Sequence, residues 1–231
     1  MKYYVWIHDL YDQTLVRITD LPFSESQYGE WNKLVDEGIP SKKSFPKNVI
    51  FEINLNYGIK IADSLPNTIN CFIVSENLKN ILDEASGDYE FFSIKLRDYK
   101  GKIIEYPYYV SNLINTLHCM DYITSDFDMP WRSCDRHIKE IRRLILDESK
   151  IPNNIQIFRL DTILNKLVLP NKYAAISLIG EPRRIVVTKT LAIKIKREAK
   201  CTGLYFVPLE EYTDFLKREF RRPLFPNIKK L

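Results

Sequence analysis

The sequence is short of the residues and motifs on which most catalytic and cofactor sites depend. It has three histidines and seven glycines in 231 residues. It contains no HExxH zinc motif, no closely spaced histidine pair, no glycine-rich phosphate loop and no GxSxG nucleophile elbow. These absences argue against a metalloprotease, a P-loop nucleotide enzyme and an α/β-hydrolase. We therefore expect no catalytic residues, no cofactor and no bound metal.

Cysteine usage points the same way. None of the four cysteines belongs to a CxxC pair, so neither a zinc site nor a disulfide framework is indicated. Cys71 and Cys201 are most simply small core residues. Cys119 follows His118 directly, but neighbouring residues on a strand point to opposite faces, which disfavours a nucleophile–base pair. We expect His118 to be a hydrogen-bonded histidine in the core or at its boundary.

Long hydrophobic runs are also missing. No apolar stretch approaches the ~18 residues of a membrane span. The apolar run at the N-terminus ends at His8 and Asp9, and it is too short and mixed for a signal peptide. We therefore expect a cytoplasmic protein without a membrane partner. What the chain does contain is 45% hydrophobic residues, with 14 tyrosines and 12 phenylalanines, which favours a strand-rich aromatic core.

One pattern occurs twice along the chain. A short apolar strand ends at a hydroxyl residue, leucine and isoleucine recur at helical spacing, and a glycine precedes a second apolar strand. At a constant offset of 113, four residues of the first unit align with four of the second: Val74, Ser75, Leu78 and Leu82 with Val187, Thr188, Leu191 and Ile195. In both units we expect the glycine, Gly87 or Gly203, to cap the helix end in a left-handed conformation.

These units predict the fold class and a division of the chain. We expect an α+β fold in which two related strand–helix–strand units pack together with antiparallel strands, as an internal pseudo-repeat. A chance match between two common patterns is the alternative. The units lie in an N-terminal half, residues 1–115, and a C-terminal half, residues 116–231. One compact domain is the other organisation that the pattern allows.

The remaining elements follow from periodicity and from breakers. Strands are predicted over 3–7, 49–55, 103–110 and 155–160, the last with alternating polar positions. A capped helix is expected over 24–38, a turn at 98–102 and a short final helix over 209–220. Pro107 removes a backbone donor from its strand and predicts an edge position or a bulge. Residues 138–146 fit a helix face and a buried strand equally well.

The segment 124–135 is the most suggestive candidate for a binding site. It reads as a polar loop that carries Asp126, Asp128, Trp131 and Arg132. Tryptophan and arginine dominate the energetics of protein–protein interfaces, whereas a core tryptophan is the alternative. A calcium site is disfavoured because the loop lacks the glycine and the bidentate glutamate of such sites. The alternative to a binding site is a solvated loop whose aspartates cap neighbouring backbone groups.

Charge is concentrated at the C-terminal end. Residues 217–231 hold six basic side chains and one acidic one, a net of +5, so the rest of the chain carries −1 of the total +4. A nucleic-acid binder usually has a basic stripe across its body, with exposed aromatic residues. A solvated tail or a protein contact therefore fits better, and nucleic-acid binding through this end is an alternative function.

Several short motifs together resemble a bacterial immunity-protein family. These are Val74–Leu78, Tyr109-Val110-x-Asn112, Asp121-x-x-x-Ser125, Ile157–Leu160, Val187-Thr188-x-x-Leu191 and Thr202–Phe206. The family is typified by a myxobacterial member and was formerly known only as a domain of unknown function. The resemblance covers residues 70–209. It departs from the family at Thr188, where serine is usual, but the hydroxyl cap is kept.

The resemblance implies a function and supplies no catalytic residues. Members are encoded beside polymorphic or secreted toxins and protect the producing cell, so we expect an immunity protein that binds and neutralises a cognate toxin. The resemblance also favours a strand over 138–146. An alternative is an enzyme that reverses or hydrolyses a toxin's product, using His118, Cys119 or Asp121.

Overall fold

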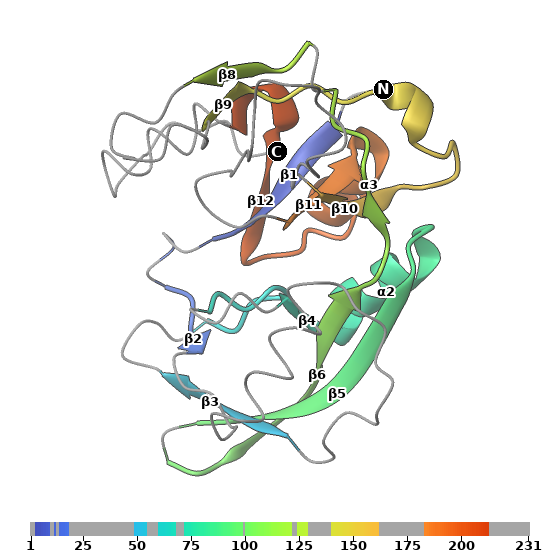
Figure 1. Cartoon of the computed structure of the whole chain (residues 1–231). Helices are drawn as coiled ribbons and strands as arrows, with labels where there is room; N and C mark the ends of the chain where they lie inside the picture. The colour runs from blue at the N-terminus through green and yellow to red at the C-terminus, as the bar shows by residue number, and fades with distance from the viewer. Residues whose placement is uncertain are drawn as a thin grey trace.

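The computed structural model describes residues 3–9, 12, 14–18, 49–54, 60–67, 72–98, 100–121, 124–128, 140–161 and 183–212. This part of the chain is a mixed α/β structure, mostly strands, with two α-helices and two mixed five-stranded sheets (Figure 1). The predicted helix over 24–38, the basic end and the residues Cys71, Trp131 and Arg132 lie outside the described residues.

One sheet, here called the β1 sheet, joins the first described strand to the last one. Its order is β12-β1-β11-β10-β7, antiparallel except for the β10–β7 pairing. Its strands are β1 (Tyr3–His8), β7 (Thr116–Leu117), β10 (Ile157–Asp161), β11 (Arg183–Thr188) and β12 (Leu204–Pro208). Both faces of β1 are buried: Tyr3 and Val5 pack into one core, and Tyr4 and Trp6 into another. This explains why the predicted strand over 3–7 lacks polar alternation.

The second sheet, the β6 sheet, has the order β2-β3-β5-β6-β4. Its strands are β2 (Arg17–Ile18), β3 (Ile50–Asn54), β4 (Phe72–Ser75), β5 (Tyr89–Arg97) and β6 (Ile103–Leu113). The strands predicted over 49–55 and 103–110 are confirmed. The bulge predicted at Pro107 is confirmed too, because the β5–β6 register shifts between the pairs Ile94–Tyr108 and Leu96–Ile104.

Both predicted units form a strand, a helix and a strand, with an antiparallel strand inserted between the two. The first unit has the arrangement β4-β6-β5 with helix α2 (Glu76–Glu84), and the second has β11-β1-β12 with helix α3 (Lys189–Ile193). The predicted caps are confirmed. The Ser75 hydroxyl accepts from the Leu78 N–H at 3.3 Å, and the Thr188 hydroxyl accepts from the Leu191 N–H at 3.4 Å.

The predicted glycine caps are wrong in both units. Helix α2 ends at Ala85 in an extended conformation, and Gly87 is absent from the positive-φ residues of the described chain. Helix α3 continues as a π-helical segment, η3 (Lys194–Glu198), after which Lys200 takes the left-handed conformation at φ 53°. Gly203 does have a φ of 79°, but it lies beyond the helix end and does not cap it. A glycine is also needed there for close packing, because a Cβ would lie 1.9 Å from the Ser64 carbonyl oxygen.

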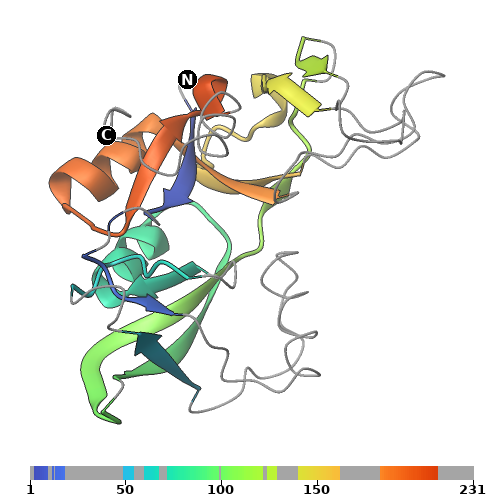
Figure 2. The same ribbon diagram turned by 90° about the vertical axis from the view of Figure 1, so that its left-hand side faces the viewer.

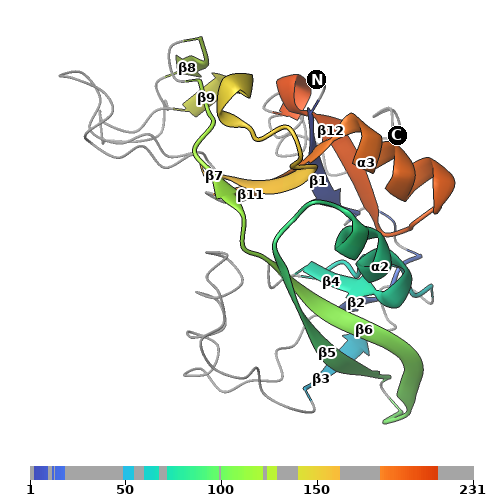
Figure 3. The same cartoon turned by 90° about the vertical axis from the view of Figure 1, so that its right-hand side faces the viewer.

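The two helices pack together where the sheets meet (Figure 3). The predicted apolar stripes share one core with the inner face of the β1 sheet: Leu78, Ile81 and Leu82 from α2, and Leu191 and Ile195 from the second unit. The Lys194 ammonium pairs with the Glu84 carboxylate across the helices. Two further cores cover the other faces of the β1 and β6 sheets. Among the described residues, no helix is both long and apolar enough to cross a membrane.

Shorter elements complete the described chain. A two-stranded sheet pairs β8 (Asp126–Asp128) with β9 (Glu140–Arg143), so the strand favoured within 138–146 is confirmed. Single 3₁₀ turns are η2 (Glu148–Lys150) and η4 (Leu209–Glu211). The predicted turn at 98–102 is confirmed, since the Asp98 N–H donates to the Lys102 carbonyl. The final helix predicted over 209–220 starts with η4, and its remainder beyond residue 212 lies outside the described residues.

Candidate functional site

The predicted binding segment, 124–135, is not a loop throughout. Asp126 and Asp128 belong to β8, which is antiparallel to β9, with a register irregularity between Asp126 and Phe127. Residues 126–128 form a strand because β9 runs back alongside them and pairs with them. Figure 2 shows this small sheet projecting at the end of the molecule away from the β6 sheet. Trp131 and Arg132, which complete the predicted site, lie outside the described residues.

Hydrogen bonds fix the base of this projection. The Ser125 hydroxyl donates to the Ile145 carbonyl at 3.3 Å and accepts from the Ile145 N–H at 3.1 Å. The Asp121 carboxylate accepts from the Thr124 N–H at 3.1 Å. Asp121 therefore caps a turn, and Ser125 joins its own segment to the one that contains Ile145. Among the described residues, no group of three His, Cys, Asp or Glu side chains could hold a metal ion.

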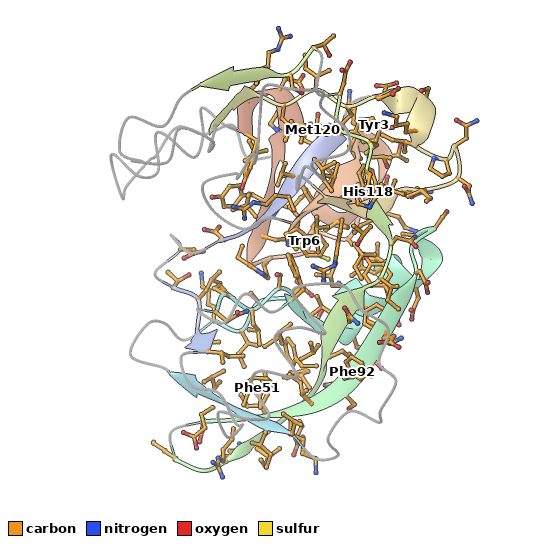
Figure 4. The ribbon with its side chains drawn as sticks, in the orientation of Figure 1. Tyr3, Trp6, Phe51, Phe92, His118 and Met120 are labelled. Atoms are coloured by element: carbon orange, nitrogen blue, oxygen red, sulfur yellow. The ribbon has the colours of Figure 1, made fainter. Side chains whose placement is uncertain are left out.

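The structure separates His118 from Cys119. His118 is exposed, so its predicted place in the core or at its boundary is wrong. The chain leaves β7 at Leu117, and the next residue turns outward. Cys119 is fully buried, and burial raises the pKa of its thiol to about 11. A thiol in that state is a poor nucleophile at neutral pH, and Figure 4 shows His118 at the rim of the β1 sheet.

A polar junction between the two units was not predicted from the sequence. The Asp63 carboxylate accepts from the Ser75 hydroxyl at 2.7 Å, and its other oxygen accepts from the Thr202 N–H at 2.9 Å. The Ser75 N–H donates to the Asp63 carbonyl at 2.7 Å. Asp63 thus ties the start of α2 to the loop before β12. No local pattern signals this role, because one partner lies 139 residues away.

His8 and Ser64 form a serine–histidine contact, and it is structural. The His8 Nδ1 lies 3.2 Å from the Ser64 hydroxyl, and the His8 ring packs against Phe72 at 4.7 Å between centroids. Burial lowers the pKa of His8 to about 4. Ser64 is fully buried, so no substrate reaches its hydroxyl. Nearby, burial raises the pKa of Cys201 to about 12, which leaves that thiol protonated.

Comparison with known proteins identifies the family. The chain matches the immunity protein family Imm11 over residues 12–170, well over half of its length. The match covers the β6 sheet and runs to β10, so it includes much of the N-terminal region that the motif resemblance over 70–209 leaves out. It ends before the second strand–helix–strand unit. A search of curated proteins found no match. The chain belongs to the Imm11 family of immunity proteins.

Proposed function

We propose that this protein neutralises a cognate bacterial toxin by direct protein–protein contact, without catalysis, in the cytoplasm of the producing cell. The observation that carries the proposal is membership of an immunity protein family, which implies toxin neutralisation. A protein that only binds its target needs a stable scaffold and an exposed patch of roughly 800 Å² per partner. It needs no nucleophile, base or metal.

Four polar groups that could serve catalysis have structural roles or are buried, which supports binding over catalysis. Asp121 caps a turn, Ser125 bonds to the backbone of Ile145, and Cys119 and Ser64 are buried. An active site instead brings several reactive groups together around an accessible space. The alternative is an enzyme that reverses the toxin's effect.

For the contact surface we propose the segment that begins with β8. Asp126 and Asp128 would face basic groups of a toxin cleft, and Trp131 with Arg132 would supply the anchor. Two observations support this choice. The β8–β9 sheet stands apart from the two large sheets (Figure 1), and its base is fixed by Ser125. The competing surface is the basic end around Arg221 and Arg222, which suits an acidic toxin surface.

Binding measurements with the toxin encoded beside this chain's gene test the proposal. Trp131→Ala and Arg132→Ala should each weaken capture of an inactive toxin while the thermal unfolding curve stays unchanged. The double variant Arg221→Ala/Arg222→Ala serves as the matched comparison and should bind like the parent. If the first two variants bind normally, the β8 segment is the wrong surface.

A protection assay separates binding from catalysis. Cells that express the active toxin should survive equally well with the parent protein and with His118→Ala, because His118 has no catalytic task in a binder. If His118→Ala folds and binds the toxin but no longer protects, the enzyme alternative is correct.

We also propose that the two strand–helix–strand units are related copies. Support comes from their common arrangement, a split pair of strands around an antiparallel third, and from hydroxyl caps at matching positions, Ser75 and Thr188. Superposition of β4-α2-β5 with β6 onto β11-α3-β12 with β1 tests this idea. A mismatch in the direction in which the two helices cross their strands would exclude it.

A further inference from the structure

The outer part of the β5–β6 hairpin contains an irregularity in its strand pairing. The pairs Ile94–Tyr108 and Leu96–Ile104 leave three residues of β6, 105–107, opposite Lys95 alone. Regular alternation would place Tyr106 on the same face as Ile104 and Tyr108, which pack in the core of the β6 sheet. The bulge instead takes Tyr106 out of that face. Bulges often serve to re-aim a side chain.

The residue that the bulge releases is the most exposed large hydrophobic side chain among the described residues. Tyr106 is 74% exposed, and Ile103, on the same outer part of β6, is 39% exposed. Single exposed apolar residues are common on protein surfaces. Here, however, two lie within four residues, and one of them is exposed because the strand departs from its regular path.

The hairpin holds this pair on a rigid support. The Asp98 carboxylate accepts from the N–H groups of Lys100 and Lys102, both at 2.9 Å, and so closes the turn. Arg97 pairs with Glu52 on the neighbouring strand β3. At the inner end, the Tyr108 hydroxyl donates to the Ala62 carbonyl at 2.8 Å. A fixed side chain loses little conformational entropy when it binds.

The edge of β6 at this point is suited to side-chain contacts and not to strand addition. Strand β4 pairs with β6 only as far as Tyr108, through Ser75. Pro107 then lacks a backbone N–H, so an incoming strand would find no regular ladder. A partner must therefore recognise the tyrosine and isoleucine side chains themselves.

The charges around the pair indicate the chemistry of the partner. Residues 95–106 carry four basic side chains, at Lys95, Arg97, Lys100 and Lys102, and two acidic ones, at Asp98 and Glu105. Glu52 of β3 pairs with Arg97, so the net charge of this surface is small but positive. An aromatic anchor inside a rim of net positive charge fits an apolar pocket bordered by carboxylates. We propose that the outer β5–β6 hairpin is a second docking surface for the toxin, with Tyr106 inserted in such a pocket. This inference rests on the proposed function.

This surface is distinct from the β8 segment. In all three ribbon views the β8–β9 sheet and the β5–β6 turn lie at opposite ends of the molecule (Figures 1, 2 and 3). A single patch of roughly 800 Å² does not reach both. Variants at the hairpin and variants at the β8 segment therefore report on independent contacts.

The test measures the affinity of the full chain for an inactive variant of the toxin encoded beside its gene. Tyr106→Ala should weaken binding by about tenfold or more, as the loss of an interface anchor does. Tyr106→Phe, which keeps the ring, should bind within about threefold of the parent, since burial of the ring supplies most of the contact. Lys102→Glu should weaken binding and reduce its dependence on salt.

Control variants make the outcome decisive. Ile61→Ser alters a side chain that is exposed to the same extent as Ile103, at 37% against 39%, but outside the hairpin. It should bind like the parent, whereas Ile103→Ser should not. If the parent binds the toxin and Tyr106→Ala binds equally well, the hairpin inference is overturned and the proposed function stands. If the parent does not bind at all, the proposed function fails, and the inference with it.

Discussion

At the scale of single residues, the chain is held by contacts between segments far apart in sequence. Gly203 is the clearest case, because it combines a positive φ with a close approach to the Ser64 carbonyl. Ser64 in turn lies beside Asp63, whose carboxylate bonds to Thr202. The close backbone packing and the Asp63 hydrogen bonds therefore occupy the same junction. A side chain at position 203 would push these segments apart.

Gly203→Ala should therefore destabilise the protein by about 3 kcal/mol or more, from left-handed strain and from overlap with backbone. Gly101→Ala is the matched control. Gly101 has nearly the same φ, 81°, but nothing lies within 4 Å of its would-be Cβ. That variant should lose only about 1 to 2 kcal/mol. Urea unfolding of both variants measures the difference, and equal losses would show that close packing at Gly203 is unimportant.

His8 predicts a dependence of stability on pH. Its pKa is about 4 in the folded protein because of burial, against about 6.5 in an unfolded chain. The unfolded state thus binds more protons between these values, so stability falls as the pH drops from about 6.5 to 4, by up to about 3 kcal/mol. Unfolding free energies at several pH values should show this slope. In His8→Gln the slope over that window should be much smaller, and an unchanged slope would contradict the assignment.

Some residue roles follow from sequence and others cannot. Ser75 and Thr188 are predictable as caps because a cap and its helix are neighbours in the chain. Asp63, Gly203 and Arg159 are different. Arg159 reads as the polar position of an alternating strand, yet it is buried, with its Nε donating to the Leu113 carbonyl at 2.5 Å. Its partner lies 46 residues away, and only the tertiary fold brings the two together.

At the scale of elements, the hydroxyl caps of the two helices are expected to differ in strength. Both Ser75 and Thr188 accept from the N–H three residues on, but Ser75 also donates to the Asp63 carboxylate at 2.7 Å. Ser75→Ala therefore removes a helix cap and one member of the junction. The loss leaves a partly buried carboxylate with one fewer donor.

Thr188→Ala should lower the free energy of unfolding by about 1 kcal/mol, the usual value of an N-cap. Ser75→Ala should lower it by about 2 kcal/mol, because a hydrogen bond to a charged group is lost as well. Ser86→Ala, at an exposed position after α2, serves as control and should have little effect. Chemical denaturation compares the three. A larger loss for Thr188→Ala than for Ser75→Ala would argue against the junction.

Helices and strands can be predicted where a hydrophobic pattern extends over enough residues. Prediction fails where an element forms only because another strand pairs with it. The apolar spacing of α2 and the runs in β1 and β3 identify those elements directly. Strand β8 is three residues long, within a polar segment, and exists only because β9 pairs with it. The helix ends were missed for a related reason. Gly87 suits a C-cap by its type, whereas the structure needs it for packing against Tyr89 and Ile157.

At the scale of the whole molecule, the two ends of the chain are interwoven. The division at residue 115 stays a prediction, and the topology bears on how such halves would behave. The β1 sheet takes strand β1, which lies between β12 and β11, from the N-terminal end, whereas its other four strands come from residues 116–208. Tyr3, Val5, Tyr4 and Trp6 contribute to two of the three cores. Figure 4 shows Trp6 where the two sheets approach each other.

A fragment of residues 116–231 should therefore show no cooperative unfolding when it is made alone. Without β1, strands β11 and β12 lose the strand that lies between them, and the apolar surfaces that β1 covers on both faces of its sheet become exposed. Such edges and surfaces favour aggregation over folding.

Mixing this fragment with residues 1–115 should restore a single cooperative transition. Circular dichroism during thermal unfolding measures that transition. A variant of the first fragment that lacks residues 1–9 should fail to do so, because it retains the β6 sheet and lacks only β1, the two residues before it and the one after it. A sharp transition in the 116–231 fragment by itself would mean that the C-terminal half folds independently and that β1 only adds to a finished sheet.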